Sequence, residues 1–400
     1  MKRTVAILAM LVVSAVAPAT ALAGAADQQA YSGSHVAFDT GSSAVVDYTV
    51  DGEQTIESVR VQSQSTAESN LGLGASAGLE AVTAIAGSAV TLDSRAAANA
   101  SLRTESGASM RAHDNGHGSL VVTADDAAQY VALNVSADSE ADQASDQRVV
   151  YETDSGATAA AMVVGDGNVS VTEDGNLTAA VAEDSRLVVR SYTEARSDAE
   201  ATEERMIVNE TAAASVYLMQ QGDATVSDTV TYGRDTSVEV SERAASRVNV
   251  TVERTASEGR VVITHVSNET FESAEDVQVA VDGEAAASAS SYAELRQATQ
   301  GGDSSKYMVR QGSSAQASAD ARVLVGINHF STRTVTMTDD GAATDTSGDD
   351  SDGADGDDGD GADGDDGDET TTSGNGSGFG AAVALLALVA VTGVALVRRH

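Results

Sequence analysis

The chain of 400 residues contains no cysteine and no tryptophan. Without cysteine, an exported protein cannot use disulfides as a source of stability. With four phenylalanines and nine tyrosines as its whole aromatic set, it also lacks the tryptophan platforms on which many sugar-binding modules stack their ligands. A folded core must therefore be built mostly from Val, Ala, Ile and Leu.

Positive charge is scarce as well. The chain has 23 Lys and Arg against 61 Asp and Glu, a net charge of -38, and Lys2 and Lys306 are its only lysines. Such self-repulsion destabilises a compact state in ordinary buffer, whereas at molar salt the Debye length falls to ~3 Å and the repulsion is screened. The composition predicts a protein of a halophile that holds diffuse cations at its surface. The same acidic field makes nucleic acid and anionic lipid poor partners.

The two ends of the chain predict export and membrane attachment. A basic start, an apolar run and a small-residue sequence indicate a secretory signal peptide over residues 1–23, cleaved after Ala23. Residues 379–397 are uncharged and apolar, and the basic end 398–400 follows them. This is the pattern of a C-terminal transmembrane helix with a cytoplasmic basic end. We expect everything between to lie outside the cell.

Residues 24–338 have the pattern of a mainly β fold. Short β-branched segments alternate with turn formers at intervals of about ten residues, and Asp51-Gly52 separates the strand-like segments 44–50 and 58–61. Regular strands and turns at this spacing are typical of a β-sandwich or a β-solenoid. Other predicted turns are Gly165-Asp166-Gly167, Glu173-Asp174-Gly175 and Glu258-Gly259.

Two short helices are expected within this β-rich region. Residues 194–205 are dense in Ala and Glu, and Ser291 can cap a helix over 292–300. The segment 71–92 fits either a small-residue helix or tightly packed strands. The length allows two domains, with a boundary near 124–130.

Residues 339–378 form an acidic segment rich in Asp and Gly. Positions 339 to 369 hold 15 acidic residues and no basic one, so we expect a disordered stalk that lifts the folded part away from the membrane. A specific calcium loop needs carboxylates at its first, third and fifth positions before the glycine, and here the fifth is Ala354 or a glycine. Diffuse cation binding is therefore expected in place of a calcium site.

The C-terminal end combines a Gly/Ser spacer, the motif Ser377-Gly378-Phe379, the apolar span and the basic end in this order. It resembles the PGF-CTERM sorting signal of haloarchaeal surface glycoproteins, with Ser377 where the family pattern has proline. The resemblance implies that an archaeosortase removes the span and joins the protein to a membrane lipid, as in other processed C-terminal anchors. Without processing, the span itself is the anchor.

Glycosylation sequons are frequent in this chain. Eight of its eleven asparagines occur in an N-x-Ser/Thr sequence, which predicts a glycoprotein whose modified side chains face solvent. The candidate glycosylation sites are Asn99, Asn134, Asn168, Asn176, Asn209, Asn249, Asn268 and Asn375.

Motifs that indicate catalysis or metal binding are few. The sequence around Ser76 matches the G-x-S-x-G of a nucleophile elbow, but polar residues precede it and no strand-helix alternation surrounds it. His113 and His117 are four residues apart, yet the Asn-Gly between them favours a turn over a helix, and no third ligand is near. His265 and His329 follow apolar strands, where structural hydrogen bonding is expected. We assign no catalytic residue, cofactor or metal.

The sequence thus predicts a membrane-anchored surface glycoprotein of a halophilic archaeon, with a structural or adhesive role among cell-envelope or S-layer components. One alternative is an anchored hydrolase that uses Ser76 or the pair His113 and His117. It requires Ser76 on a strand-to-helix turn near a histidine and a carboxylate. The other alternative is an extracellular ligand-binding or sensory ectodomain, which requires one deep pocket.

Overall fold

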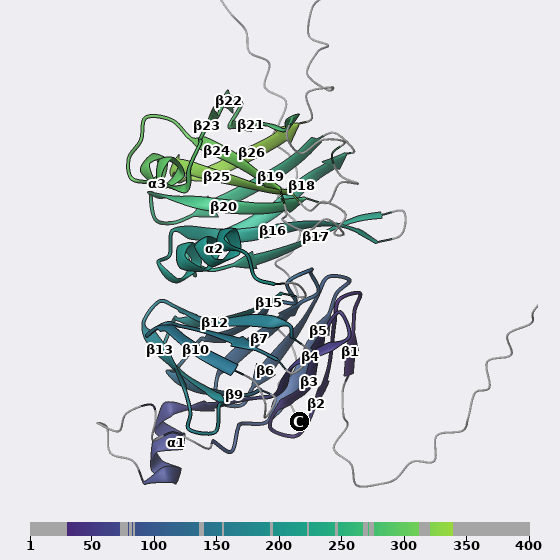
Figure 1. Ribbon diagram of the computed structural model, residues 1–400, viewed down its shortest axis with the longest axis vertical. Coiled ribbons are helices and arrows are strands. Elements are labelled where there is room, and N and C mark those ends of the chain that lie inside the picture. The colour runs from purple at the N-terminus through teal and green to yellow at the C-terminus, as the bar shows by residue number, and fades with distance from the viewer. Residues whose placement is uncertain are drawn as a thin grey trace, which may run out of the picture. The chain divides into compact units, whose positions relative to one another are not determined.

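The computed structural model shows a mainly β protein (Figure 1). The helices among the described residues have 8, 11 and 8 residues, and none is long and apolar enough to cross a membrane. The structure describes residues 30–338 except for 73–78, 80–81, 83–84, 136–139, 154–155, 193–194, 222–223, 245–246, 267–270, 272–275 and 312–320.

Several predicted features lie outside these described residues. They are the signal peptide 1–23 with Ala23, Ser76, Asn268, the acidic segment 339–378 with Asn375, the sorting motif Ser377-Gly378-Phe379, the span 379–397 and the basic end 398–400.

The first half of the chain forms two antiparallel sheets, which we call sheets A and B. Sheet A has seven strands in the order β1 (Ala30–Ser32), β2 (Val36–Thr40), β3 (Val45–Val50), β4 (Glu53–Ser63), β9 (Gln129–Asn134), β14 (Leu177–Val181) and β13 (Gly167–Val171). Sheet B has eight strands in the order β10 (Glu140–Ser145), β11 (Arg148–Glu152), β12 (Thr158–Val164), β15 (Arg186–Tyr192), β8 (Leu120–Ala124), β7 (Ala108–His113), β6 (Asn99–Thr104) and β5 (Val90–Arg95).

Sheets A and B pack face to face around one hydrophobic core, and we call them the first sandwich. Alternate residues of each strand point inward, as the period of two requires. In β2, for example, Val36, Phe38 and Thr40 are buried. The ring of Phe38 stacks with its centroid 5.5 Å from Tyr31 and 5.9 Å from Tyr48. Most of the remaining core is Val, Ala and Leu, as the composition predicts.

The hairpin between β3 and β4 has the conformation that its sequence predicts. Asp51 and Gly52 both have positive φ, 51° and 83°, a region that Gly and, less readily, Asp adopt without large strain. The strands then pair antiparallel, with Val50 opposite Glu53. The Asp-Gly turn is confirmed.

The second half of the chain forms sheets C and D. Sheet C has six strands in the order β17 (Ala224–Thr231), β16 (Ala212–Gln221), β20 (Glu258–Val266), β25 (Ala321–His329), β24 (Lys306–Gln311) and β23 (Ala287–Ser288). Sheet D has five strands in the order β18 (Thr236–Ala244), β19 (Arg247–Arg254), β26 (Thr332–Thr338), β21 (Gln278–Val281) and β22 (Glu284–Ala285).

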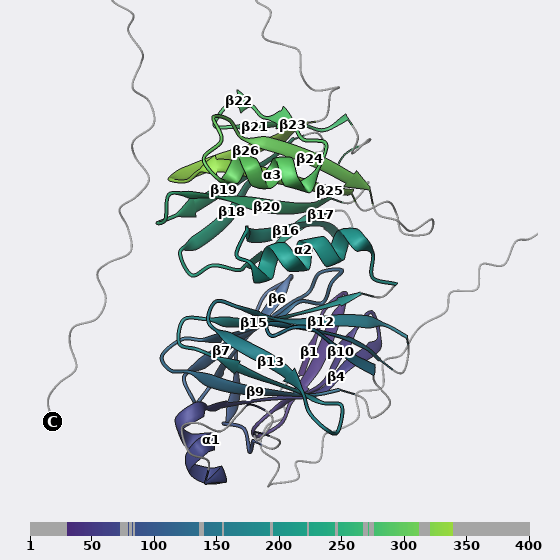
Figure 2. The same cartoon turned by 60° about the vertical axis from the view of Figure 1, so that its left-hand side comes forward.

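Sheets C and D share a second hydrophobic core, and we call them the second sandwich. In β19, for example, Val248, Val250 and Val252 point into it while the residues between them face outward. A third core lies between the outer face of sheet B and the free face of sheet C, and it takes in residues of α2 (Asp198–Val208) and α3 (Tyr292–Thr299). Helix α2 therefore lies at the junction of the two sandwiches (Figure 2).

Both predicted helices are present, although α2 covers Asp198–Val208 where 194–205 was predicted, and each begins with a capping serine. Ser197 and Glu200 form a reciprocal capping box at the start of α2, and the Ser291 side chain accepts from the backbone N–H of Glu294 at the start of α3. A further short helix, α1 (Gln64–Leu71), was not predicted. It ends at Gly72 with a positive φ of 66°.

Two expectations about the chain's course differ from the structure. The segment 124–130 connects β8 of sheet B to β9 of sheet A, inside the first sandwich; the chain leaves that sandwich only after β15.

Gly259 lies within β20 and is not a turn residue. A Cβ at this position would lie 2.4 Å from the carbonyl oxygen of Ile327 and 2.6 Å from that of Thr299, so glycine is needed here for close backbone approach.

Candidate functional site

The loop between β7 and β8, residues 114–119, ties sheet B to the second sandwich. Nδ1 of His113, at the end of β7, lies 2.9 and 3.1 Å from the two carboxylate oxygens of Asp228 on β17. Nδ2 of Asn115 donates to the same carboxylate at 2.8 Å. All three side chains are buried. Because hydrogen bonds to a carboxylate are strong when water is excluded, they form a firm link between the sandwiches.

Asp114 fixes the same loop to sheet A. Its buried carboxylate accepts from the backbone N–H groups of Ser34, His35 and Val36, each at 2.7 Å. The turn that presents these donors comes so close that a Cβ on Gly33 would lie 2.3 Å from the carboxylate carbon. Glycine at position 33 is therefore a condition for this contact.

Gly33→Ala is expected to lower the free energy of unfolding by about 2 kcal/mol, because the added methyl forces Asp114 away from its three donors. Denaturant unfolding in molar salt measures the loss. Gly116→Ala is the matched control, since a Cβ there has no atom within 4 Å, and it should change stability by less than about 0.5 kcal/mol. Equal effects of the two variants would contradict this role of Gly33.

His113 and His117 do not share a ligand site. A turn closed by a 2.7 Å hydrogen bond from the N–H of Gly118 to the carbonyl of Asn115 separates them. The ring of His117 instead packs with its centroid 5.0 Å from that of His265 on β20. Within the described residues, no group of three or more His, Cys, Asp or Glu side chains could hold a metal ion. The observed positions of His113 and His117 therefore do not support a hydrolase that uses this pair.

A cluster of buried charged side chains surrounds the inner face of α2. Glu203 of α2 lies between two arginines that come from the two sandwiches. Nη2 of Arg190 on β15 is 3.5 Å from one carboxylate oxygen, and Nη1 of Arg322 on β25 is 3.2 Å from the other. The side chains of Arg190 and Glu203 are both 0% exposed, and that of Arg322 is 6% exposed. We call these residues, together with Glu200, His117 and His265, the junction cluster.

Strand register places the junction-cluster residues of the second sandwich next to one another. His265 on β20 lies beside Tyr217 on β16 and beside Arg322 on β25. The rings of Tyr217 and His265 stack with centroids 4.3 Å apart and planes 4° from parallel. His117 reaches this row from sheet B, and its Nε2 accepts from Nη2 of Arg190 at 3.2 Å. An acceptor at Nε2 assigns the ring proton of His117 to Nδ1.

The charges of the junction cluster shift the pKa values of its titratable groups. Burial and the neighbouring Arg190 lower the pKa of His117 to about 4. Burial, His117 and Arg190 hold the pKa of His265 well below its usual value. Although burial opposes it, His117 and hydrogen bonds from Ser197 lower the pKa of Glu200 to about 2. At neutral pH both imidazoles are therefore uncharged beside an ionised carboxylate.

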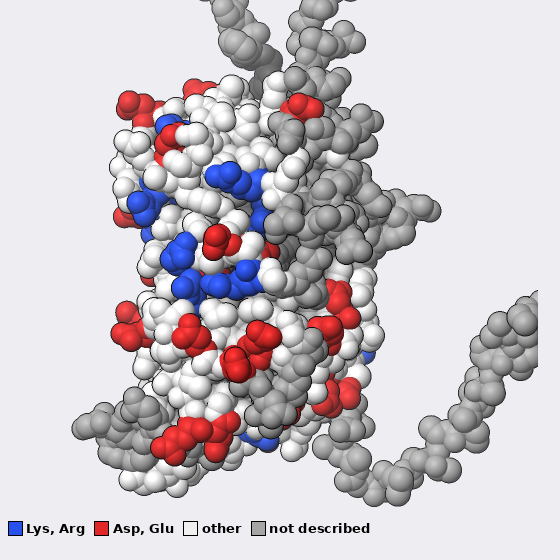
Figure 3. Space-filling view, in the orientation of Figure 1, with Lys and Arg blue, Asp and Glu red and all other residues white. Residues whose placement is uncertain are grey.

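A second carboxylate of α2, that of Glu204, is buried beside the cluster. Nε and Nη2 of Arg196 donate to its oxygens at 2.5 and 2.6 Å, and the hydroxyl of Tyr192 donates at 2.9 Å. Arg148 on β11 lies 3.3 Å away. On the face shown in Figure 3, Lys and Arg side chains gather around α2, while Asp and Glu are dispersed.

The junction cluster has side chains that could act as an acid and a base, but a substrate has little access to them. A neutral imidazole beside a carboxylate can exchange protons with a substrate only where the substrate can reach it. Arg190 and Glu203 are fully buried, and the side chains of His117 and Glu200 are only 13% and 20% exposed. Neither of the two surface grooves described below is lined by these residues or by His265. We therefore interpret the cluster as the joint that fixes one sandwich to the other.

The sequence pointed to only part of this cluster. His117 and His265 were singled out, and the structural role expected for His265 is what its packing indicates. His329 is exposed and lies against the side chain of Arg333. Arg190 and Arg322 were missed, although each borders an apolar run in its strand, Leu187–Val189 in β15 and Val323–Val325 in β25, a pattern that signals a buried partner.

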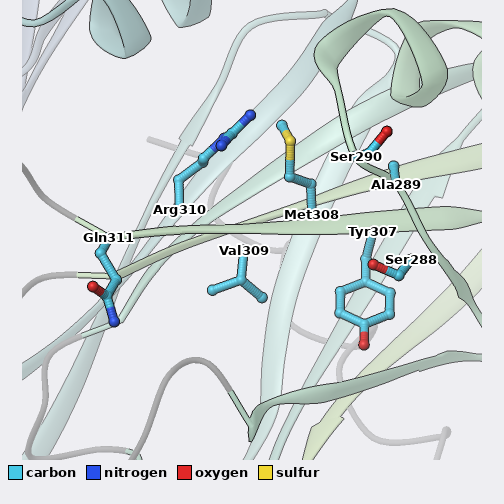
Figure 4. A pocket seen from close by; sticks show the side chains of 8 residues that line it. All are labelled: Ser288, Ala289, Ser290, Tyr307, Met308, Val309, Arg310 and Gln311. Atoms are coloured by element: carbon cyan, nitrogen blue, oxygen red, sulfur yellow. The ribbon is translucent and has the colours of Figure 1, made fainter.

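Two surface grooves lie away from the junction cluster, and both are open to solvent. One, of about 530 Å³, follows β24 and is lined by Ser288, Ala289, Ser290 and residues 307–311. Figure 4 shows Met308 and Arg310 on one side of this strand and Val309 and Gln311 on the other. The second groove, of about 380 Å³, lies on sheet B. Neither is the single deep pocket that a solute-binding ectodomain requires.

Sequence comparison leaves the chain without a family. No protein-family model matches it, and a search of curated proteins finds none that is significantly similar. Its own residues must therefore support any functional proposal.

Proposed function

We propose that this protein is a structural or adhesive glycoprotein of a halophilic archaeal cell surface. In this proposal residues 1–23 direct export, residues 339–378 form an acidic stalk, and the C-terminal end attaches the protein to the membrane, as a span or through archaeosortase and a lipid. Its partners are components of the cell envelope or S-layer, with diffuse cations at its surface. A pair of sandwiches joined by a shared core and buried ion pairs suits a role in which the protein is a spacer or a contact surface.

The observation that carries the proposal is the placement of the sequon asparagines. Of those that the structure describes, Asn168 and Asn209 are exposed and none is buried; Asn99, Asn134, Asn176 and Asn249 are half-buried. They come from both sandwiches and from the end of α2. The three asparagines outside sequons include Asn115, which is fully buried. Glycosylation requires that a sequon asparagine reach solvent, and none of the six described ones is fully buried.

Mass analysis of the protein extracted from its native membrane tests this proposal. We expect glycans on the peptides that contain Asn168 and Asn209, and either a lipid in place of residues 379–397 or an intact span. Asn70 is the internal control, because it is exposed but outside a sequon, and its peptide should have the encoded mass. Unmodified asparagines at 168 and 209 would contradict the glycoprotein assignment, and recovery of the protein from the soluble fraction would contradict its anchoring.

A further inference from the structure

The groove on sheet B lies on the outer face of the first sandwich, next to β17 of the second. Residues of β5, β6, β7, β8 and β15 line it from sheet B, and Thr229 and Thr231 of β17 line it from the other side. Three arginines, six serine or threonine residues of sheet B and β17, and two aspartates face one space. We call it the arginine groove; the residues used below are Arg103, Arg111, Arg186, Ser109, Thr123 and Asp93.

The strand register sets the spacing of the three arginines. Arg103 on β6 lies opposite Ser109 on β7. Ser109 in turn lies opposite Thr123 on β8, which lies opposite Arg186 on β15. Since neighbouring strands are about 4.8 Å apart, the backbones of Arg103 and Arg186 are about 14 Å from each other. Arg111 stands two residues along β7 from Ser109, on the same face, so three cationic side chains border a patch of hydroxyls.

The described residues neutralise this positive charge only in part. Nε of Arg103 is 3.4 Å from Asp93, and both side chains are more than half exposed. Arg186 donates to the carbonyl and hydroxyl of Thr231 at 2.6 and 3.2 Å, but its Nε is buried with no partner among the described residues. Arg111 makes no hydrogen bond or ion pair with any residue that the structure describes. In a chain of net charge -38, three guanidinium groups around one groove are unexpected, and that of Arg111 has no partner among the described residues.

We propose that the arginine groove binds an acidic polysaccharide whose sugars carry carboxylates, and that this is the adhesive contact of the proposed surface protein. Guanidinium groups bind carboxylates through paired, charge-assisted hydrogen bonds. The hydroxyls of Ser109 and Thr123 can both donate to and accept from sugar hydroxyls. No Phe, Tyr or Trp lines the groove, and the ring of His113 is buried against Asp228, so a neutral sugar has no exposed ring to stack on. The carboxylates therefore decide which polymer binds.

The position of the groove favours a saccharide over an acidic peptide. Extended peptides bind by adding a strand to a free sheet edge, where backbone groups await partners. Strands β6, β7 and β8 are each paired on both sides, so the floor of the groove offers side chains only. A peptide backbone lying there would lose water without gaining backbone hydrogen bonds.

Binding of the full-length protein, purified in detergent at molar salt, to immobilised polygalacturonate tests this inference, with dextran as the neutral polymer. Arg111→Ala is expected to weaken binding to polygalacturonate about tenfold or more, the effect of losing one charged hydrogen-bonding group. Arg103→Ala should weaken it in the same direction. Arg205→Ala is the matched control: Arg205 is exposed on α2, where its Nη2 donates to Thr202, and binding should not change.

Several results would overturn the inference. These are no binding to polygalacturonate, equal binding to dextran, an equal loss in Arg205→Ala, or tighter binding of poly-aspartate, which would assign the groove to an acidic peptide. The inference about the ligand rests on the proposed function, but the two can fail separately. If the protein is glycosylated and anchored but does not bind polygalacturonate, only the proposed ligand is wrong. If it is unglycosylated and soluble but binds polygalacturonate, the ligand of the groove is supported and the proposed surface role is wrong.

Discussion

Replacing Arg190 with methionine is expected to lower the free energy of unfolding by about 3–5 kcal/mol. The side chain is fully buried and lies 3.5 Å from the carboxylate of Glu203, which is also fully buried. Methionine fills a similar volume but leaves that carboxylate with Arg322 as its one cationic partner among the described residues, and it removes the donor to His117. Breaking one partner of a buried pair is costly because the remaining charge is still out of water. Denaturant unfolding at molar salt measures the change.

Arg103→Met is the matched control for Arg190→Met. Arg103 also lies on an outward-facing strand position of sheet B, but its side chain is 74% exposed and its contact with Asp93 is 3.4 Å long. Exposed ion pairs contribute about 0–1 kcal/mol, and less at high salt. If the two variants lose the same stability, the junction cluster does not hold the sandwiches together.

Acid is expected to destabilise the protein by about 3 kcal/mol between pH 6.5 and pH 4 through His117 alone. The pKa of His117 is lowered to about 4 in the folded state from 6.5 in the unfolded chain. The unfolded chain therefore binds a proton first as the pH falls, so stability is complete above pH 6.5 and declines until pH 4. A pKa difference of this size is worth about 3 kcal/mol because each unit corresponds to ~1.4 kcal/mol. His265 acts in the same direction.

Urea titrations at a series of pH values and constant salt measure this decline. His117→Gln should make the decline between pH 6.5 and pH 4 shallower, with the remaining slope due to His265. His329→Gln, which changes an exposed side chain, is the control. Below pH 4 a further loss is expected as Glu200, with a pKa of about 2 in the folded state, becomes protonated. A stability curve that is level from pH 7 to pH 4 would show that neither buried histidine stays neutral.

Local elements could be predicted because their signals are local. The Asp51-Gly52 turn, the Ser291 cap and the β-branched strands depend on residues next to one another in the chain. Gly259 shows the limit of such signals, since Glu-Gly has the composition of a turn. What decides its conformation is the approach of two carbonyl groups from β25 and α3, which no local pattern contains.

The junction cluster could not be predicted either, because its contacts join residues that are far apart in the chain. Glu203 and Glu204 lie in a helix rich in Ala and Glu, a composition that usually faces solvent. Glu203 is buried where β15 and β25, more than a hundred residues apart in the chain, each bring an arginine to that helix. Glu204 is buried among Arg196, Tyr192 and Arg148. The pairing of sheets B and C determines that meeting, and nothing in the sequence near α2 indicates it.

The position of β26 has a consequence for how the protein carries mechanical load. This last described strand lies inside sheet D, paired along its length with β19 and along Val335–Thr338 with β21. If the chain is tethered beyond Thr338, as proposed, a pull along the axis of β26 must shear both hydrogen-bonded ladders at once, because neither side of β26 is an open edge from which it could be unzipped bond by bond. A tether at this position would therefore pull on a strand that resists tension.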